Sequence, residues 1–379
     1  MNAKVYYSQK KNTQEAVAEI IKEITQEDIK LVMFFVSPIH DFEYVSKGIY
    51  NEFSHSEVMG ATTAGEICNK GFMDDGLLAI SISSKTMKVK SIMIEDGHKH
   101  PILYKNKIED TMKEAGLNPD SSNISNEGFG IGLFNGVVCL EEKLLSVIYS
   151  VIKDSEFNIV GGSAGDGSNF KNTFISYNGK VIDDGCVVTF VKTNERFCIK
   201  KENIFKLSGK TMTATKVDVR NRVIYELNGN PASTEYARIL GIDEKDLNRY
   251  FTINPLGRMI GDEIFIATPT QINPDKSITV YAQVLPYSIV DILEPLDPKE
   301  VLHQTLTEVK EEIPNLKLLI SFNCLLRTLY FKEKKITGDL TNIFNEYVPL
   351  LCGFSSYGEQ YKKFHMNETL TILALGWDE

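Results

Sequence analysis

The sequence predicts an α+β protein of two domains. Apolar, β-branched runs of strand length alternate with helix-length segments in which leucine, isoleucine, valine and tyrosine recur at helical spacing. The chain has 379 residues, more than a single hydrophobic core usually holds. Hydrophobic residues make up 42% and charged residues 24%, as in ordinary globular proteins. We therefore expect two domains, residues 1–200 and 201–379, with mixed, largely antiparallel sheets flanked by helices.

The predicted elements of the first half follow in two blocks. The first block has a buried strand at 30–37, a helix at 41–53, neighbouring strands at 76–83 and 87–94, and a helix at 108–115. The second has a strand at 128–134, a helix at 141–152, a strand at 157–162, and a meander over 172–191 around the turn Asn178-Gly179.

The second half continues the mixed pattern. It has a strand at 223–229, a helix opened by Pro231, a strand pair at 263–269 and 277–283, a helix at 298–312, a strand at 317–323, a helix at 340–346, and strands at 350–356 and 369–375. Residues 328–340 (TLYFKEKKITGDL) are predicted as a lysine-rich loop.

Composition excludes several classes of protein. The net charge of −10 and the pI near 5.3 leave no basic surplus to displace phosphate counterions, so nucleic acid is not an expected partner. The six cysteines show no C-x-x-C spacing and indicate reduced thiols in a cytosol. No secretory apolar segment is visible, and the apolar runs are too short to cross a bilayer. We expect a cytoplasmic protein without membrane insertion.

Self-comparison of the sequence finds one pattern three times. A strand and a helix are followed by a short strand that ends in a glycine-framed loop with an acid, and the chain then returns as an apolar strand. The three segments are 58–66 (VMGATTAGE), 159–166 (IVGGSAGD) and 350–359 (LLCGFSSYGE). We call their loops the acid loops. Such self-similarity indicates a duplicated strand-helix-strand unit.

The acid loops are the predicted ligand site. Glycine lets the backbone take positive φ and turn N–H groups outward toward an anion, while a terminal acid can accept bonds from an ammonium group. The candidate residues are Thr62, Thr63, Gly65 and Glu66 in the first loop, Ser163, Gly165 and Asp166 in the second, and Ser355, Tyr357, Gly358 and Glu359 in the third. For any single loop, the favoured alternative is a tight connection whose acid binds nearby backbone N–H groups. The ligand hypothesis requires that folding brings all three loops to one hollow.

A further candidate segment ends the strand at 317–323. Asn323, Cys324 and Arg327 are assigned to the ligand site, because a guanidinium there can bind a ligand carboxylate in bidentate fashion. A salt bridge from Arg327 to Glu359 or Asp339 explains this arginine nearly as well. Cys324 is interpreted as a small buried hydrophobe.

Other chemistry is not indicated. The six histidines are scattered, so neither a metal site nor a catalytic cluster is predicted. The pairs Asp74-Asp75 and Asp183-Asp184 precede glycines and suit turns. The Rossmann fingerprint is incomplete and no P-loop lysine is present, so we expect no cofactor.

The acid loops and their surroundings resemble the FIST family (F-box and intracellular signal transduction). VMGATTAGEI with DDGLLAISI, and IVGGSAGD with the NG and DDG turns after it, resemble the FIST N-terminal domain. VDVRNRVIYELNGNPASTEYARILGI, NPLGRMIGDEIFIATPT, ISFNCLLR, GFSSYGE and NETLTILALG resemble the FIST C-terminal domain. The resemblance extends from about residue 29 onward. The family's glycine-rich, glutamate-bearing connection after the arginine is replaced here by residues 328–340.

The resemblance implies a non-catalytic sensory module for small ligands, with amino acids as the usual suggestion, as found in bacterial signalling proteins. Because the sequence shows no F-box, kinase, cyclase or methyl-accepting region, we expect the signal to pass to a separate partner protein. Two alternatives stay open. One is a thiol-dependent hydrolase or transferase that uses Cys324 with His303 or His365. The other is a protein-interaction scaffold with an exposed apolar patch.

Overall fold

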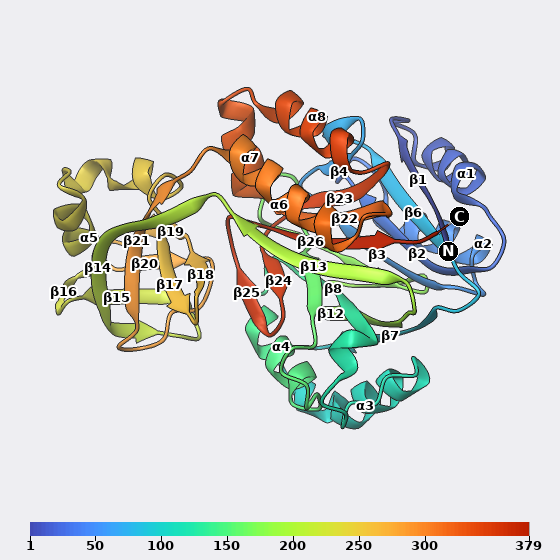
Figure 1. Ribbon diagram of the computed structural model, residues 1–379. Helices are drawn as coiled ribbons and strands as arrows, with labels where there is room; N and C mark the ends of the chain where they lie inside the picture. The colour runs from blue at the N-terminus through green and yellow to red at the C-terminus, as the bar shows by residue number, and fades with distance from the viewer. Residues whose placement is uncertain (379) are drawn as a thin grey trace. The chain divides into compact units, whose positions relative to one another are not determined.

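The computed structural model describes residues 1–378 and confirms the α+β class (Figure 1). Two compact units make up the chain. The first comprises Met1–Lys201, Leu302–Phe364 and the chain from Leu370 onward, and the second comprises Glu202–Val301 and His365–Thr369. The chain leaves the first unit next to the predicted boundary at residue 200, but it returns at Leu302. The compact units therefore differ from the two sequence halves, because the last strands pair with strands of the first half.

The first unit consists of three copies of one pattern. The first copy is β1 (Asn2–Ser8), α1 (Thr13–Ile24), β2 (Ile29–Val36), α2 (Phe42–Glu52), β3 (Glu57–Thr62), β4 (Glu66–Cys68), β5 (Gly71–Met73) and β6 (Leu77–Ser83). The second is β7 (Lys88–Glu95), α3 (Lys105–Glu114), β8 (Gly128–Phe134), α4 (Glu141–Tyr149), β9 (Ile159–Ser163), β10 (Ile175–Tyr177), β11 (Lys180–Ile182) and β12 (Gly185–Lys192). Short 3-10 helices occupy Pro101–Tyr104 and Ile124–Asn126.

The third copy is interrupted. It begins with β13 (Arg196–Asn203) and resumes, after most of the second unit, with α6 (Pro298–Glu312), β22 (Leu316–Cys324), α7 (Leu325–Glu333), α8 (Thr337–Tyr347), β23 (Leu350–Ser356), β24 (Glu359–Tyr361), β25 (Phe364–Met366) and β26 (Thr369–Gly376). The repeated strand-helix-strand unit predicted from the acid loops is thus present three times.

Each sheet of the first unit contains a hairpin from another copy. The strand orders are β1-β6-β2-β3-β10-β11, β7-β12-β8-β9-β24-β25 and β13-β26-β22-β23-β4-β5. The hairpin after each acid loop therefore leaves its own copy: β10 pairs with β3, β24 with β9 and β4 with β23, all antiparallel. Each acid loop connects a strand of one sheet to a strand of another sheet, and these three connections lie next to one another.

The strands β2, β8 and β22 are buried on both faces. On β2, Leu31, Met33 and Phe35 join a core that also contains residues of β8 and β22, and Val32, Phe34 and Val36 pack with α1 and α2. The helices α3 and α4 cover the outer face of the second sheet in the same way (Figure 1). Burial on both faces explains why the sequence here is an unbroken apolar run instead of an alternating one.

Several predicted pairings were wrong. The strands expected as neighbours at 76–83 and 87–94 are β6 and β7, which belong to different sheets, as do β11 and β12 of the expected meander. The residues expected as a loop after Arg327 form most of α7 and the start of α8, and in α7 Leu325, Thr328 and Phe331 recur at helical spacing and are buried. Local sequence identifies an apolar strand, but the pairing partner depends on how the three copies assemble.

The second unit is an antiparallel sheet with one α-helix. Its strands are β14 (Phe205–Asp218), β15 (Val223–Leu227), β16 (Asn230–Pro231), β17 (Leu256–Ile260), β18 (Glu263–Ala267), β19 (Pro269–Ile272), β20 (Ile278–Val280) and β21 (Ile289–Pro295), in the order β18-β17-β21-β14-β15-β20-β19 with β16 on β15. The helix α5 (Ala232–Leu240) precedes the 3-10 helix Glu244–Tyr250. Pro231 is the N-cap residue of α5 and not its first residue, and β18 and β20, expected as a pair, are not neighbours.

No helix within residues 1–378 combines the length and the apolar character needed to span a bilayer.

The parallel pair β8–β9 depends on two facing glycines. A Cβ at Gly161 would lie 2.0 Å from the carbonyl oxygen of Gly132. We expect Gly161→Ala to lower the free energy of unfolding by about 2 kcal/mol or more, since the backbone must move. Gly338→Ala is the matched control, because Gly338 lies in α8 with open space around its Cα, and alanine there should stabilise by about 0.5–1 kcal/mol. Urea unfolding measures both, and equal effects would contradict the close approach.

Candidate functional site

The three acid loops form a closed ring. Two backbone hydrogen bonds join every pair of loops. The first and third loops are joined by Ala64 N to Ser355 O (3.0 Å) and Ser355 N to Gly65 O (2.7 Å). The second and first loops are joined by Gly165 N to Thr62 O (2.9 Å) and Gly167 N to Thr63 O (3.0 Å). The third and second loops are joined by Tyr357 N to Ser163 O (3.0 Å) and Ser163 N to Gly358 O (2.8 Å). The loops therefore lie together, as the ligand hypothesis requires.

A hydroxyl group lies three residues before each acid of the ring. The Thr63 hydroxyl donates to Glu66 Oε1 (2.6 Å), and the Ser356 hydroxyl donates to Glu359 Oε1 (2.6 Å). In the second loop the hydroxyl of Ser163 instead donates to Glu141 Oε1 (3.1 Å). Ser356 was not among the predicted residues, although the spacing S-x-x-E would have identified it.

Asp166 binds the backbone of its own loop. Its carboxylate accepts hydrogen bonds from the N–H groups of Phe170 (2.8 Å), Lys171 (3.0 Å) and Asn172 (2.9 Å), and from the hydroxyl of Tyr357. Burial alone would raise the pKa of this carboxyl group, but these donors outweigh burial and hold the pKa below its ordinary value. For this loop the alternative interpretation is correct: the anion held by the backbone is the protein's own carboxylate.

Glu66 has the opposite character at the equivalent position. Its side chain is 1% exposed, and Oε2 has no hydrogen-bond partner within residues 1–378. Burial raises the pKa of the carboxyl group to about 8, against the partial compensation of the Thr63 hydroxyl. Glu66 is therefore mostly uncharged at neutral pH and cannot pair with an ammonium group as an anion.

Tyr357 of the third loop reaches the second loop. Alanines stand at the equivalent positions of the other two loops, Ala64 and Ala164. The aromatic ring of Tyr357 crosses to the second loop and stacks on Phe170, with ring centroids 4.3 Å apart and planes 18° apart. The small alanine side chains leave room for this arrangement.

A cleft of about 280 Å³ lies against the first and second loops. It is lined by Ser37, Pro38, Ile39, Ala64, Gly65, Asp74, Asp75, Asp166, Gly167 and Asn169. Its lining takes no residue from the third loop, which contacts the second through Tyr357. The cleft therefore borders two of the three loops, and not all three as expected. Asp74 and Asp75, interpreted as turn residues, were missed as lining residues.

Charges of both signs border the cleft in pairs. Lys332 Nζ lies 2.8 Å from each carboxylate oxygen of Asp74, and Lys11 Nζ lies 3.3 Å from Asp75 Oδ2. The aspartate side chains are 61% and 57% exposed. Exposed ion pairs of this kind stabilise a fold little, so a ligand can replace them at small cost.

The predicted residues around Arg327 form a buried network. Arg327 Nε donates to Asn323 Oδ1 (3.0 Å), Asn323 Nδ2 donates to Thr328 Oγ1 (2.9 Å), and that hydroxyl lies 2.8 Å from Ser355 Oγ. Arg327 is 3% exposed, and its guanidinium lies 5.3 Å from the centre of the Phe331 ring. The neighbouring cavity measures about 10 Å³, about the space of one water molecule. These residues do not line the cleft beside the acid loops.

Cys324 ends β22 beside this network and is 1% exposed. His303, one of the two histidines considered as its base, lies 3.4 Å from the hydroxyl of Tyr347. Within residues 1–378, no group of three histidine, cysteine, aspartate or glutamate side chains is arranged to hold a metal ion.

Comparisons with known proteins identify the family. Residues 30–230 match the FIST N domain, and residues 232–362 match the FIST C domain. The chain belongs to the FIST family. FIST domains are associated with sensing in signal transduction, and the three acid loops of this FIST protein lie within the matched ranges. The two matches meet C-terminal to the boundary expected at residue 200.

Similarity outside the family is slight. No curated protein matches this FIST protein significantly. A search of solved structures matches 18 chains, among them the crystal structure of a cyanuric acid hydrolase from A. caulinodans, at a TM-score of 0.35 and 6% sequence identity over 99% of both chains. Similarity at this level supports no inference about activity.

The buried Glu66 carboxyl predicts a pH dependence of stability. Its pKa of about 8 in the folded state lies above the ordinary 4.5, so folding binds a proton, and the stability contribution is full below about pH 4.5 and is lost as pH rises toward 8. The slope should reach about 1.4 kcal/mol per pH unit. Glu66→Gln cannot titrate, so its stability relative to wild type should rise across this range in urea unfolding. Parallel curves for the two proteins would contradict a buried neutral acid.

Asp166→Ala should destabilise the second acid loop. The change leaves three backbone N–H groups without their acceptor, and we expect the free energy of unfolding to fall by about 2–3 kcal/mol at pH 7. Because the folded pKa of Asp166 is lowered, its contribution exists above the ordinary pKa and is lost as pH falls below about 4. Asp120→Ala, which removes an exposed carboxylate, is the control and should change little. A loss of equal size in both variants would refute the assigned role.

Proposed function

We propose that this FIST protein is a non-catalytic sensory module that binds a small zwitterionic metabolite, with an amino acid as the candidate ligand. The proposal rests on one observation: a cleft of about 280 Å³ lies against the first and second acid loops, and paired charges of both signs border it. This volume is close to the lower end of the usual range for small-molecule sites, about 300–1,000 Å³.

The pairing of the charges favours a zwitterion over a simple ion. A cation that binds Asp74 would leave Lys332 without its partner, and an anion that binds Lys332 would leave Asp74 without its own. A ligand with an ammonium and a carboxylate group replaces one ion pair by two. Asp75 and Lys11 offer the same exchange at a second point of the cleft.

The remaining lining is suited to a short side chain. Ile39, which is 42% exposed, and Pro38 supply an apolar wall. Gly167 has positive φ and little packed against its Cα, so a ligand can approach the backbone closely at the second loop. The acids of the ring are not competitors for the ligand, because Asp166 is bound to its own loop and Glu66 is buried.

The same features support a role in binding instead of catalysis. The Cys324 thiol is 1% exposed, so a substrate would reach it only after a rearrangement. Asp74 and Asp75 are exposed and each is paired with a lysine, whereas a general acid that acts near pH 7 usually needs a buried carboxyl group. In this proposal a separate signalling protein detects the occupied state.

Thermal shift and calorimetry against the free amino acids test the proposal. A ligand at 100 times its dissociation constant should stabilise the protein by about 2.7 kcal/mol. Asp74→Asn and Lys332→Gln should each weaken binding about tenfold or more, because each removes one of the two charged side chains with which the zwitterion pairs. Methyl esters and N-acetyl derivatives of the same ligand carry one charge and should bind more weakly than the parent zwitterion.

The second copy of the repeat provides a matched control. Asp183 precedes β12 as Asp74 precedes β6, but it does not line the cleft, so Asp183→Asn should leave affinity unchanged. An affinity that fails to respond to Asp74→Asn, or an equal loss in Asp183→Asn, would exclude the cleft as the binding site. A full absence of stabilisation by any amino acid would exclude the ligand class.

A further inference from the structure

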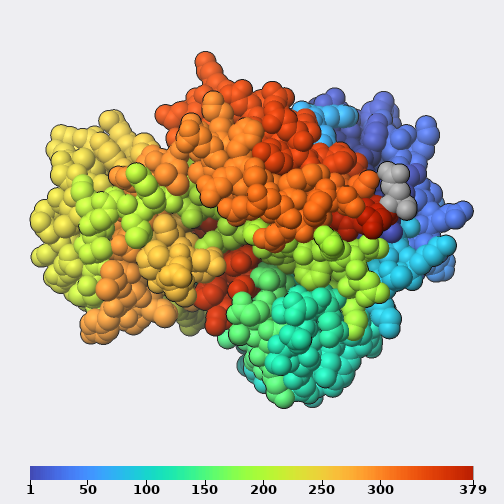
Figure 2. All heavy atoms as spheres, viewed as in Figure 1, coloured from blue at the N-terminus to red at the C-terminus, as the bar shows by residue number. Residues whose placement is uncertain are grey.

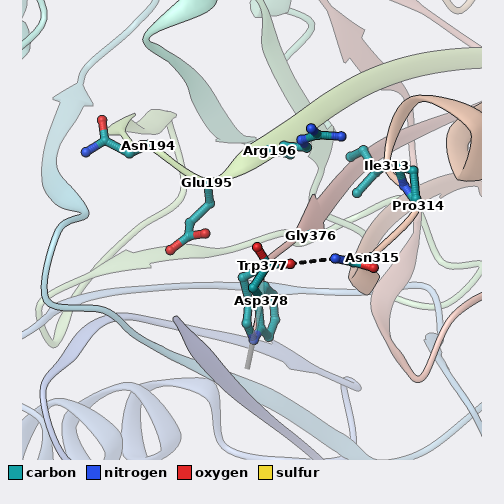
Figure 3. A pocket seen from close by; sticks show the side chains of 9 residues that line it. All are labelled: Asn194, Glu195, Arg196, Ile313, Pro314, Asn315, Gly376, Trp377 and Asp378. Carbon is teal, nitrogen blue, oxygen red and sulfur yellow. Dashed lines mark hydrogen bonds between the residues drawn. The ribbon is translucent and has the colours of Figure 1, made fainter.

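A second hollow of about 280 Å³ lies in the third copy of the first unit (Figure 3). It is lined by Asn194, Glu195, Arg196, Ile313, Pro314, Asn315, Gly376, Trp377 and Asp378. These residues come from the start of β13, the turn between α6 and β22, and the end of β26. Figure 2 shows yellow-green, orange and red atoms meeting on this face of the molecule. Asn315 precedes β22, whereas Asn323 lies near its other end, so this hollow and the acid loops are at opposite ends of one strand.

Gly376 allows the walls of the hollow to come close. A Cβ at this residue would lie 2.2 Å from Ile313 Cγ2 and 2.9 Å from the carbonyl oxygen of Asn315. The turn that carries Ile313, Pro314 and Asn315 therefore packs directly on the end of β26. A hollow with such a constrained floor keeps its shape without a ligand.

The charged side chains that line the hollow differ in whether they have a partner. Glu195 pairs with the α-ammonium group of Met1 at 3.7 Å, and Asp378 accepts a hydrogen bond from the Asn315 side chain (Figure 3). For Arg196, an exposed residue, no ion pair or hydrogen bond of the guanidinium is found within residues 1–378. The group that can gain most from a ligand is therefore a cation with planar, bidentate donors, which matches a carboxylate.

The apolar part of the lining is aromatic. Trp377 is the single tryptophan of the chain, is 9% exposed, and belongs to the central core, so its indole is held rigidly at the hollow. Ile313 and Pro314 complete this apolar surface. From the unpaired guanidinium beside a fixed indole, we infer that this hollow is a second binding site, for a small aromatic carboxylate.

Fluorescence of Trp377 tests this site directly. Under selective tryptophan excitation, benzoate should change the emission in a saturable way. Benzamide and benzylammonium, which keep the ring but lose or invert the charge, should bind at least about tenfold more weakly. Arg196→Gln should weaken benzoate binding about tenfold or more, Arg196→Lys should restore part of it, and Asp378→Asn should strengthen it by removing a nearby negative charge.

Two controls make the result decisive. Lys113→Gln removes one exposed positive charge far in sequence from the hollow and should leave benzoate affinity unchanged. If Arg196→Gln leaves the unfolding temperature unchanged, the loss of benzoate binding in this variant is not caused by a loss of stability; the residue is exposed. Preference for benzylammonium over benzoate, or affinity for benzoate that survives Arg196→Gln, would overturn the inference. Asp74→Asn should leave the benzoate response intact, so failure of this site and failure of the amino-acid cleft are distinguishable.

Discussion

The ring of backbone hydrogen bonds among the three acid loops is the constraint on which the first unit depends. Each copy sends the hairpin after its acid loop to the sheet of another copy, so no copy completes its sheet alone. Buried backbone groups need partners, and at the crossing points the loops supply them for one another, two bonds for every pair. The position of any one loop is thereby fixed by the other two, which places the cleft on a rigid support.

Within this ring, Asp166 and Glu66 hold equivalent positions in two copies of the repeat, but their carboxyl groups differ in charge. Asp166 is short enough to remain within its own loop, where three N–H groups and a phenol stabilise its charge. Glu66 enters the core with one hydroxyl donor and is neutral near pH 7 because burial disfavours its charge. The acids that mark the repeat in the sequence are thus structural groups. The charges that a ligand can meet come from neighbouring turns and helices, through Asp74, Asp75 and their lysines.

The threefold pattern is broken at the third acid loop. Tyr357 stands where the other copies have alanine and stacks on Phe170 of the second loop, and the cleft lies against the first and second loops. The third copy also contains the insertion of the second unit and a separate hollow at the opposite end of β22. Divergence of three copies in this way leaves the shared core intact, because the inner faces of β2, β8 and β22 remain apolar. A FIST protein can therefore present different chemistry at each copy on one support.

Periodic apolar residues and glycine-framed loops are local in the chain, so the fold class, most strand and helix positions, the threefold pattern and the family could be predicted from the amino-acid sequence. It also favoured, for a single loop, the interpretation that holds for Asp166. The strand pairing, the helix at residues 325–333 and the burial of Arg327 in a side-chain network became visible only in the folded chain. The physical reason is that pairing, burial and cavity volume depend on residues far apart in the chain, as when Lys332 meets Asp74.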